Sequence, residues 1–118
     1  MAVFAFVVTI LIGLLPALAQ SAADVEYVMR QNGIQCVRAP CPVIDVSVVA
    51  TGQLTRVVDV DVAAVAASDA QRAELATGVR AGWFVVTGRI ERRGEADIFV
   101  VSRILRRAPN APPRAQLP

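Results

Sequence analysis

Apolar and polar residues alternate along several short stretches of the chain, which is the pattern of half-buried β-strands. Residues 26–31 are expected to form the first strand. Two clearer alternations follow in residues 43–50 and 54–62, and a Thr-Gly turn signal at Thr51 separates them. Arg56 interrupts the apolar face of the second stretch, which indicates a strand edge or end. The side chains predicted to point inward are Ile44, Val46, Val48, Ala50, Leu54, Val58, Val60 and Val62.

A helix is expected next, because Ser68 and Gln71 have the spacing of a capping box. In this arrangement the serine caps the first turn and the glutamine reaches back to the residues before it. The helix is predicted to span residues 69–77 and to end at Gly78 or Gly82, since glycine is the usual residue just past a helix.

The last part of the pattern predicts a hairpin, with one arm in residues 83–92, a turn at residues 93–95 and a second arm in residues 96–105. The second arm is apolar on both faces over residues 98–101. It is therefore expected to be a central strand with neighbours on both sides.

The order strand, loop, hairpin, helix, hairpin predicts an α+β domain in residues 20–105. We expect a small antiparallel sheet or an open β-barrel of about five strands with one short helix. Residues 106–118 are expected to form a disordered Pro/Arg-rich tail, because the prolines cannot continue a sheet. These prolines are Pro109, Pro112, Pro113 and Pro118.

The N-terminal segment is predicted to be a signal peptide spanning residues 1–19. Its apolar run, residues 2–15, is too short for a comfortable membrane span and ends at Pro16 before an Ala-Leu-Ala cleavage motif. No Lys or Arg precedes the run, and the competing interpretation is an uncleaved anchor. Cleavage after Ala19 would give a periplasmic or secreted protein without stable membrane insertion.

Composition restricts the chemistry of the chain. The 118 residues carry a net charge of +2, every basic residue is arginine, and there is no histidine. A Ser-His-Asp triad and histidine ligation of metals are therefore impossible. We expect a protein that is not an enzyme and that holds no cofactor and no metal. Scarce aromatic residues disfavour nucleic acid as a partner, even though the C-terminal third is basic.

The two cysteines are the most informative candidates. Cys36 and Cys41 have the spacing C-x4-C, which differs from the C-x-x-C redox motif and supplies too few ligands for a zinc site. In an oxidising compartment we expect a structural disulfide across a proline-containing turn. The alternative is an inhibitor loop that presents Arg38 to a trypsin-like protease, although four residues between the sulfurs make a tight segment.

Two further sets of residues have competing interpretations. Trp83 is expected in or at the rim of the core, and the functional alternative is a carbohydrate-binding platform. The acids Asp45, Asp59 and Asp61 have the alternation of a solvated strand face. If they gathered on one face of the sheet, they would instead suit a hard cation such as calcium.

The chain resembles a group of small exported bacterial proteins with a Cys/Pro-rich turn, an aspartate-bearing strand and a closing hairpin. The resemblance covers about residues 25–105 and lies in the segments IQCVRAPCPVIDVSVVATG, TRVVDVDVAAVAASDAQ and AGWFVVTGRIERRGEADIFVVSRI. Because no activity is assigned to that group, the resemblance implies an exported β-rich domain and no catalytic residue.

Together these features predict an exported, non-enzymatic protein with a binding or stabilising role at the cell envelope. Its partner would be an unidentified protein or envelope component, with Arg38 and Trp83 as the candidate binding residues. The alternative function is protease inhibition through Arg38.

Overall fold

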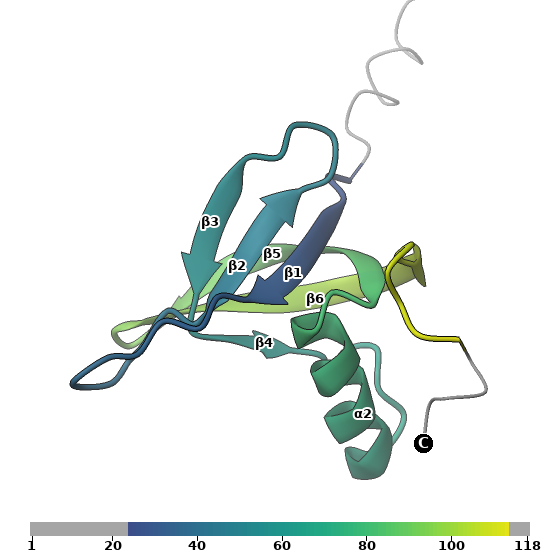
Figure 1. The fold of residues 1–118 in the computed structure, drawn as a ribbon. Coiled ribbons are helices and arrows are strands. Elements are labelled where there is room, and N and C mark those ends of the chain that lie inside the picture. Colours follow the sequence, from purple (N-terminus) through teal and green to yellow (C-terminus); the bar gives the residue numbers. More distant parts are fainter. Residues whose placement is uncertain (1–23, 114–118) are drawn as a thin grey trace, which may run out of the picture.

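The computed structural model describes residues 24–113 and shows an α+β fold with one open sheet of six strands (Figure 1). The predicted signal peptide and its cleavage site lie outside the described residues. The sheet order is β3-β2-β1-β5-β6-β4. The elements are β1 (Tyr27–Gln31), β2 (Ile44–Val48), β3 (Leu54–Val57), β4 (Asp59–Asp61), α2 (Asp69–Arg80), β5 (Phe84–Arg93) and β6 (Ala96–Arg107).

The sheet is mixed, which corrects the expectation of an antiparallel sheet. Strands β1, β2, β3, β5 and β6 pair antiparallel, whereas β4 runs parallel to β6. The reason lies at Val58, where the predicted strand 54–62 divides into β3 and β4. These two strands lie at opposite edges of the sheet. The backbone N–H of Val58 donates to the carbonyl of Asp97 at 2.8 Å, so the chain joins β6 as soon as it leaves β3.

The division at Val58 also changes which side chains face the core. Leu54, predicted to point inward, is 48% exposed, and Val57 is fully buried in its place. Val60 and Val62 are buried as predicted. A single continuous alternation cannot describe both strands, because Val57 and Val60 are three residues apart and yet both reach the core.

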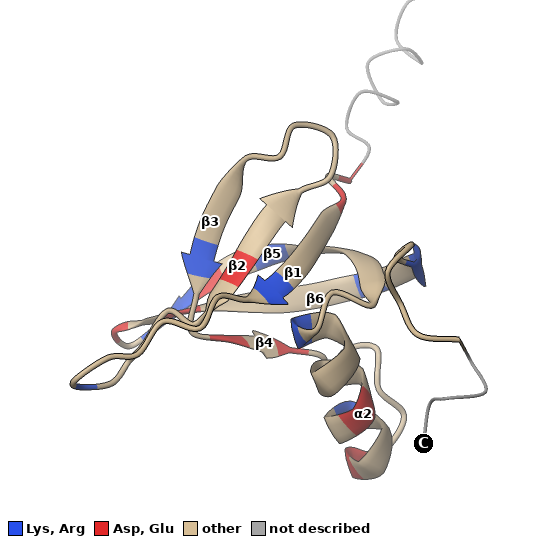
Figure 2. Cartoon of the chain, in the orientation of Figure 1, with Lys and Arg blue, Asp and Glu red and all other residues tan. Residues whose placement is uncertain are grey.

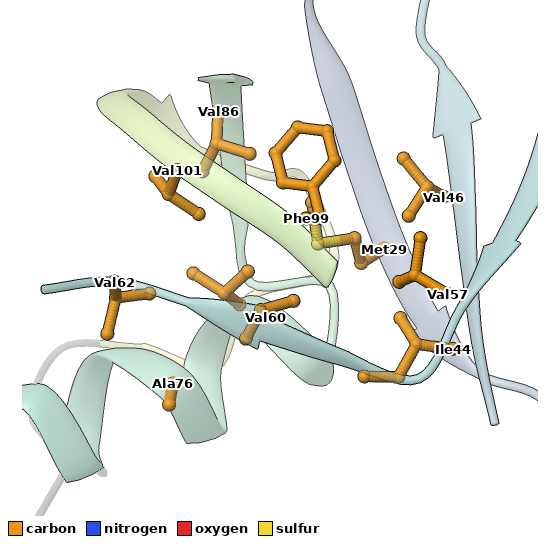
Figure 3. Packing of buried hydrophobic residues seen from close by; sticks show 11 residues of the cluster. Met29, Ile44, Val46, Val57, Val60, Val62, Ala76, Val86, Phe99 and Val101 are labelled. Atoms are coloured by element: carbon orange, nitrogen blue, oxygen red, sulfur yellow. The ribbon is translucent and has the colours of Figure 1, made fainter. Parts of the chain in front are cut away.

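The core lies between the curved sheet and α2. Phe99 of β6 is completely buried near its centre, and its ring meets the ring of Tyr27 edge-on with 5.0 Å between centroids. Figure 3 shows Phe99 and Met29 between the valines of β5 and β6 and the apolar side chains of β2 and β3. The buried cluster consists of Met29, Ile44, Val46, Val57, Val60, Val62, Ala76, Val79, Val86, Phe99 and Val101.

The helix begins as predicted. Ser68 is the N-cap, and its hydroxyl accepts a hydrogen bond from the Gln71 N–H at 3.1 Å, while the Gln71 side chain accepts one from the Ala67 N–H. The helix continues past Gly78 to Arg80 and ends before Gly82, the second of the two predicted glycines, whose φ of 80° is typical of the residue just past a helix. Gly78 instead provides room for packing. A Cβ at Gly78 would lie 2.5 Å from the ring of Phe84. Within residues 24–113, no helix is both long and apolar enough to cross a membrane.

The predicted hairpin of β5 and β6 is confirmed, and β6 is a central strand between β5 and β4. The strand continues to Arg107, two residues beyond the predicted boundary. Ala108 is buried and donates its N–H to the Trp83 carbonyl at 2.8 Å, so the first residues assigned to a tail belong to the domain. The carbonyl of Trp83 thus extends the hydrogen bonding between β5 and β6 by one residue beyond Arg107. The prolines of the C-terminal segment gave no indication of this contact. Residues 114–118 lie outside the described part.

Candidate functional site

The segment between β1 and β2, which we call the cysteine loop (residues 32–43), is an exposed feature of the described chain. It projects away from the sheet as the dark-blue segment in Figure 1. All residues from 35 to 40 are exposed. The predicted disulfide between Cys36 and Cys41 is confirmed, with 5.7 Å between the two Cα atoms, and the peptide bond before Pro40 is cis.

The tip of the cysteine loop presents an apolar and a cationic side chain next to each other. Val37 has a relative exposure of 105%, although valine is among the residue types most often buried. Arg38 is exposed and forms no ion pair with any residue in the range 24–113. Figure 2 shows one basic segment in the loop, and the other loop residues carry no charge.

The backbone of the loop forms a tight turn. Five residue steps of extended chain would span about 17 Å, whereas the Cα atoms of Cys36 and Cys41 are 5.7 Å apart. The side chains of Val37 and Arg38 therefore stand on a closed turn and not on an extended strand. Such a turn can place a cation and a methyl-bearing side chain in a partner's recess.

The base of the loop is held by Asn32, which follows β1 directly. Its side-chain Nδ2 donates to the Pro42 carbonyl at 2.9 Å and to Asp45 Oδ1 at 3.0 Å, and its Oδ1 accepts from the Ile34 N–H at 2.8 Å. In the sequence, Asn32 stands out only because it precedes Gly33, and an Asn-Gly pair is typical of a turn. Its contacts with residues ten and more positions away could not be predicted from that signal.

Asp45 is buried, although its alternation predicted a solvated side chain. Its carboxylate accepts hydrogen bonds from Asn32 and from Arg56 Nε at 3.3 Å. Arg56 lies on the edge strand β3, directly opposite Asp45, as its interruption of the apolar pattern indicated. Asp45 thus links the base of the cysteine loop to the edge of the sheet.

We expect the disulfide to stabilise the domain without determining its fold, because the strands on both sides pair through their own ladders. Replacing both cysteines by serine should lower the free energy of unfolding by about 2 kcal/mol, the chain-entropy value for a loop this short. Urea unfolding measures the difference, and circular dichroism should show an unchanged sheet.

Reduction of the wild-type protein is the matched control and should reproduce the same loss of stability. The disulfide would be contradicted if both thiols of the protein, purified without reductant, reacted with a thiol reagent under native conditions.

The acids of β4 line a second site, a cavity of about 700 Å³ between β4 and α2. Asp59 pairs with Arg80 and Asp61 with Arg93, both at 2.8 Å, so positive and negative charges balance there. Asp45 lies on β2, on the other side of β1, β5 and β6 from β4. The three acids considered for calcium therefore do not gather. Among the described residues, no group of three or more His, Cys, Asp or Glu could hold a metal ion.

The aspartates of β4 also occupy backbone donors at the edge of the sheet. Asp59 Oδ1 accepts from the Val60 N–H at 2.7 Å, and Asp61 Oδ1 accepts from the Ala63 N–H at 2.9 Å. The hydrogen bond from Ala63 and then that from Arg93 lower the pKa of Asp61 below its ordinary value. These contacts give both acids a structural role, since occupied edge donors discourage pairing with another strand.

The lowered pKa of Asp61 makes its contribution to stability dependent on pH. A carboxylate whose pKa is lower in the folded state stabilises the fold above its unfolded pKa, and this stabilisation is lost as the pH falls through the folded pKa. The difference in unfolding free energy between the wild type and Asp61→Asn should therefore be constant above about pH 5 and shrink below about pH 4.

Urea unfolding of the two proteins between pH 7 and pH 3 measures this difference. Glu95→Gln is the control, because Glu95 is exposed in the hairpin turn and forms no ion pair within residues 24–113. A difference for Asp61→Asn that stayed constant down to pH 3 would show that its carboxylate is not held by Ala63 and Arg93.

Trp83 lies apart from the cysteine loop, at the junction between α2 and β5. It is half-buried, its backbone N–H donates to the Gly78 carbonyl at 2.9 Å, and its ring lies over the Cα of Gly78. The structure therefore does not bring the two candidate binding residues, Arg38 and Trp83, into one site. Of the two, Arg38 is the one with an exposed and unpaired side chain.

Comparison with protein-family models gives a match to "Domain of unknown function (DUF6748)" over residues 8–106. The matched range includes the cysteine loop, the helix and all but the last residue of the sheet. No curated protein and no solved structure matches the chain. The match agrees with the expectation of a family without an assigned activity.

Proposed function

The chain belongs to the family of the domain of unknown function DUF6748, and from its exposed cysteine loop we propose that it is an exported, non-enzymatic binding protein. In this proposal it acts at the cell envelope, and the cysteine loop is the part that contacts the partner. The observation that carries the proposal is the tip of the loop, where Val37 is fully exposed beside an unpaired Arg38.

The disulfide supports the exported location. Disulfides form and persist in oxidising compartments and are rare in the cytosol. A loop closed by a disulfide also loses less conformational freedom when it binds than an open loop does, which favours affinity.

The chemistry of the tip indicates what the partner offers. An arginine without an internal partner is suited to a carboxylate, which it can bind through two parallel hydrogen bonds. A fully exposed valine gains free energy when apolar surface covers it. The partner is therefore a protein with an acidic recess and an apolar rim.

Photo-crosslinking tests this proposal. A photo-reactive residue placed at position 37 of the exported protein should capture a discrete partner from an envelope extract. Arg38→Ala should weaken binding of that partner by about 30-fold or more, the scale of an interface arginine that dominates affinity. Arg72→Ala is the matched control, because Arg72 is a half-exposed arginine on α2, outside the loop. Equal binding by wild type and Arg38→Ala would contradict the proposal.

The alternative function is inhibition of a trypsin-like protease, and the exposure of Arg38 is the observation that favours it. Such a protease requires an extended segment around the arginine, and the tight turn between Cys36 and Cys41 does not supply one. A trypsin assay separates the two functions. Inhibition that disappears in Arg38→Ala would support the inhibitor, whereas unaffected trypsin leaves the binding role as the better explanation.

A further inference from the structure

We propose that Asn32 is the positioning residue of the cysteine loop, fixing the direction in which Val37 and Arg38 point. This inference rests on the proposed binding function of the loop and names the residue that holds the loop in its binding orientation. Asn32 itself lies at the base of the loop, and its contacts run to the loop's own backbone and to Asp45.

The hydrogen bonds of Asn32 reach both arms of the loop. On the outgoing arm its Oδ1 accepts the Ile34 N–H, and on the returning arm its Nδ2 donates to the Pro42 carbonyl. Its backbone N–H adds a bond to the Val43 carbonyl at 2.9 Å. An asparagine side chain supplies one acceptor and two donors within this short reach, and all three are used here.

The disulfide cannot perform this task, because it closes only residues 36–41. Gly33 lies between the disulfide and the sheet with a φ of 73°. Because glycine has no Cβ and adopts many backbone conformations, the chain can pivot at this position and the closed tip can turn as a unit. Asn32 spans this point by holding Ile34 on one side of it and Pro42 opposite. The disulfide therefore sets the shape of the tip, and Asn32 sets its direction.

Asp45 anchors Asn32 in turn. The second bond from Asn32 Nδ2 ends on the buried Asp45 carboxylate, which Arg56 of β3 also contacts. The loop is thereby fastened to two neighbouring strands beyond β1. A partner meeting a loop already held in its bound direction has less ordering to impose, which raises affinity.

The test compares Asn32→Ala with the wild type, both with the disulfide intact. The Ile34 amide should exchange its hydrogen at least tenfold faster, because its acceptor is removed. Under non-reducing conditions, trypsin cleavage after Arg38 should stay at the wild-type rate, because the disulfide still closes residues 36–41. Binding of the crosslinked partner should weaken by a factor similar to that of the exchange.

Asn110→Ala is the matched control, because Asn110 is an exposed asparagine outside the loop, and it should leave all three measurements unchanged. If Asn32→Ala unfolds the domain, Asn32→Leu serves in its place, because leucine fills nearly the same space but supplies neither the acceptor for Ile34 nor the donors for Pro42 and Asp45.

The outcomes separate this inference from the proposed function. Unchanged exchange at Ile34 in a folded variant would overturn the role of Asn32, and faster cleavage after Arg38 would show that the disulfide alone does not set the shape of the tip. Faster exchange at Ile34 with undiminished partner binding would establish Asn32 as the residue that orients the loop and would overturn the proposal that the loop is the binding element.

Discussion

Replacing Phe99 with alanine should lower the free energy of unfolding by about 3–5 kcal/mol, the range for removing a buried phenylalanine. Phe99 is completely buried, and its ring contacts Tyr27 of β1 and lies beside Gly88 of β5. The ring therefore joins strands that are far apart in the sequence. A domain this small has only a narrow margin of stability, and we expect the variant to be largely unfolded at physiological temperature.

Thermal and urea unfolding measure this loss. Ile90→Ala is the control, because Ile90 pairs directly with Phe99 across the hairpin but is 42% exposed. The control should stay within about 1 kcal/mol of the wild type, since truncating a partly exposed residue leaves no closed cavity. A loss of less than about 2 kcal/mol for Phe99→Ala would show that the surrounding side chains collapse into the space.

Gly88→Ala should be the second severely destabilising change, with a loss of about 3 kcal/mol. A Cβ at Gly88 would lie 2.1 Å from the Val100 carbonyl oxygen and 2.7 Å from the Phe99 ring. The carbonyl belongs to the paired strand β6 and cannot move without disturbing the ladder. The pairing of β5 with β6 shifts register between Thr87 and Gly88, directly before this close approach.

The neighbouring change Thr87→Val provides the control for Gly88→Ala. Thr87 is buried, and its hydroxyl has no hydrogen-bond partner in the part of the chain that the structure describes. Replacing it with an apolar group of the same shape should leave stability unchanged or raise it. The double variant Gly88→Ala, Phe99→Leu should recover nothing, because the clash with the Val100 carbonyl persists. If the double variant were more stable than Gly88→Ala alone, the destabilising contact would be with the Phe99 ring and not with the Val100 carbonyl.

Local patterns predicted the features of this fold that depend on neighbouring residues. The capping box of Ser68 and Gln71, the hairpin around Gly94 and the Cys36–Cys41 disulfide are all interactions over a few positions, and the structure contains each of them. Features that depend on distant partners were not predictable. Alternation shows that Val60 is buried, but it does not show that β4 crosses the sheet to pair with β6.

The candidate site divides in the same way. The sequence identified the cysteine loop and Arg38, because a proline-containing turn between two cysteines is visible locally. It did not identify Asn32 as the base of the loop, since its side chain acts on Pro42 and Asp45. The sequence also suggested a calcium site at Asp59 and Asp61, whereas the fold pairs both with arginines. Arg80 and Arg93 are 21 and 32 positions away from the aspartates they contact.

The crossing at Val58 sets the order in which the domain can assemble. The edge strands β3 and β4 both come earlier in the sequence than β5 and β6, the two strands that lie between β1 and β4 in the sheet. A chain that ends after α2 can form the three-stranded group of β1, β2 and β3 and can close the cysteine loop. It cannot give β4 a neighbour or cover Met29, because β5 and β6 are missing. Pairings that join such distant segments form slowly. We therefore expect the domain to gain most of its stability late, when the C-terminal hairpin of β5 and β6 takes its place between β1 and β4.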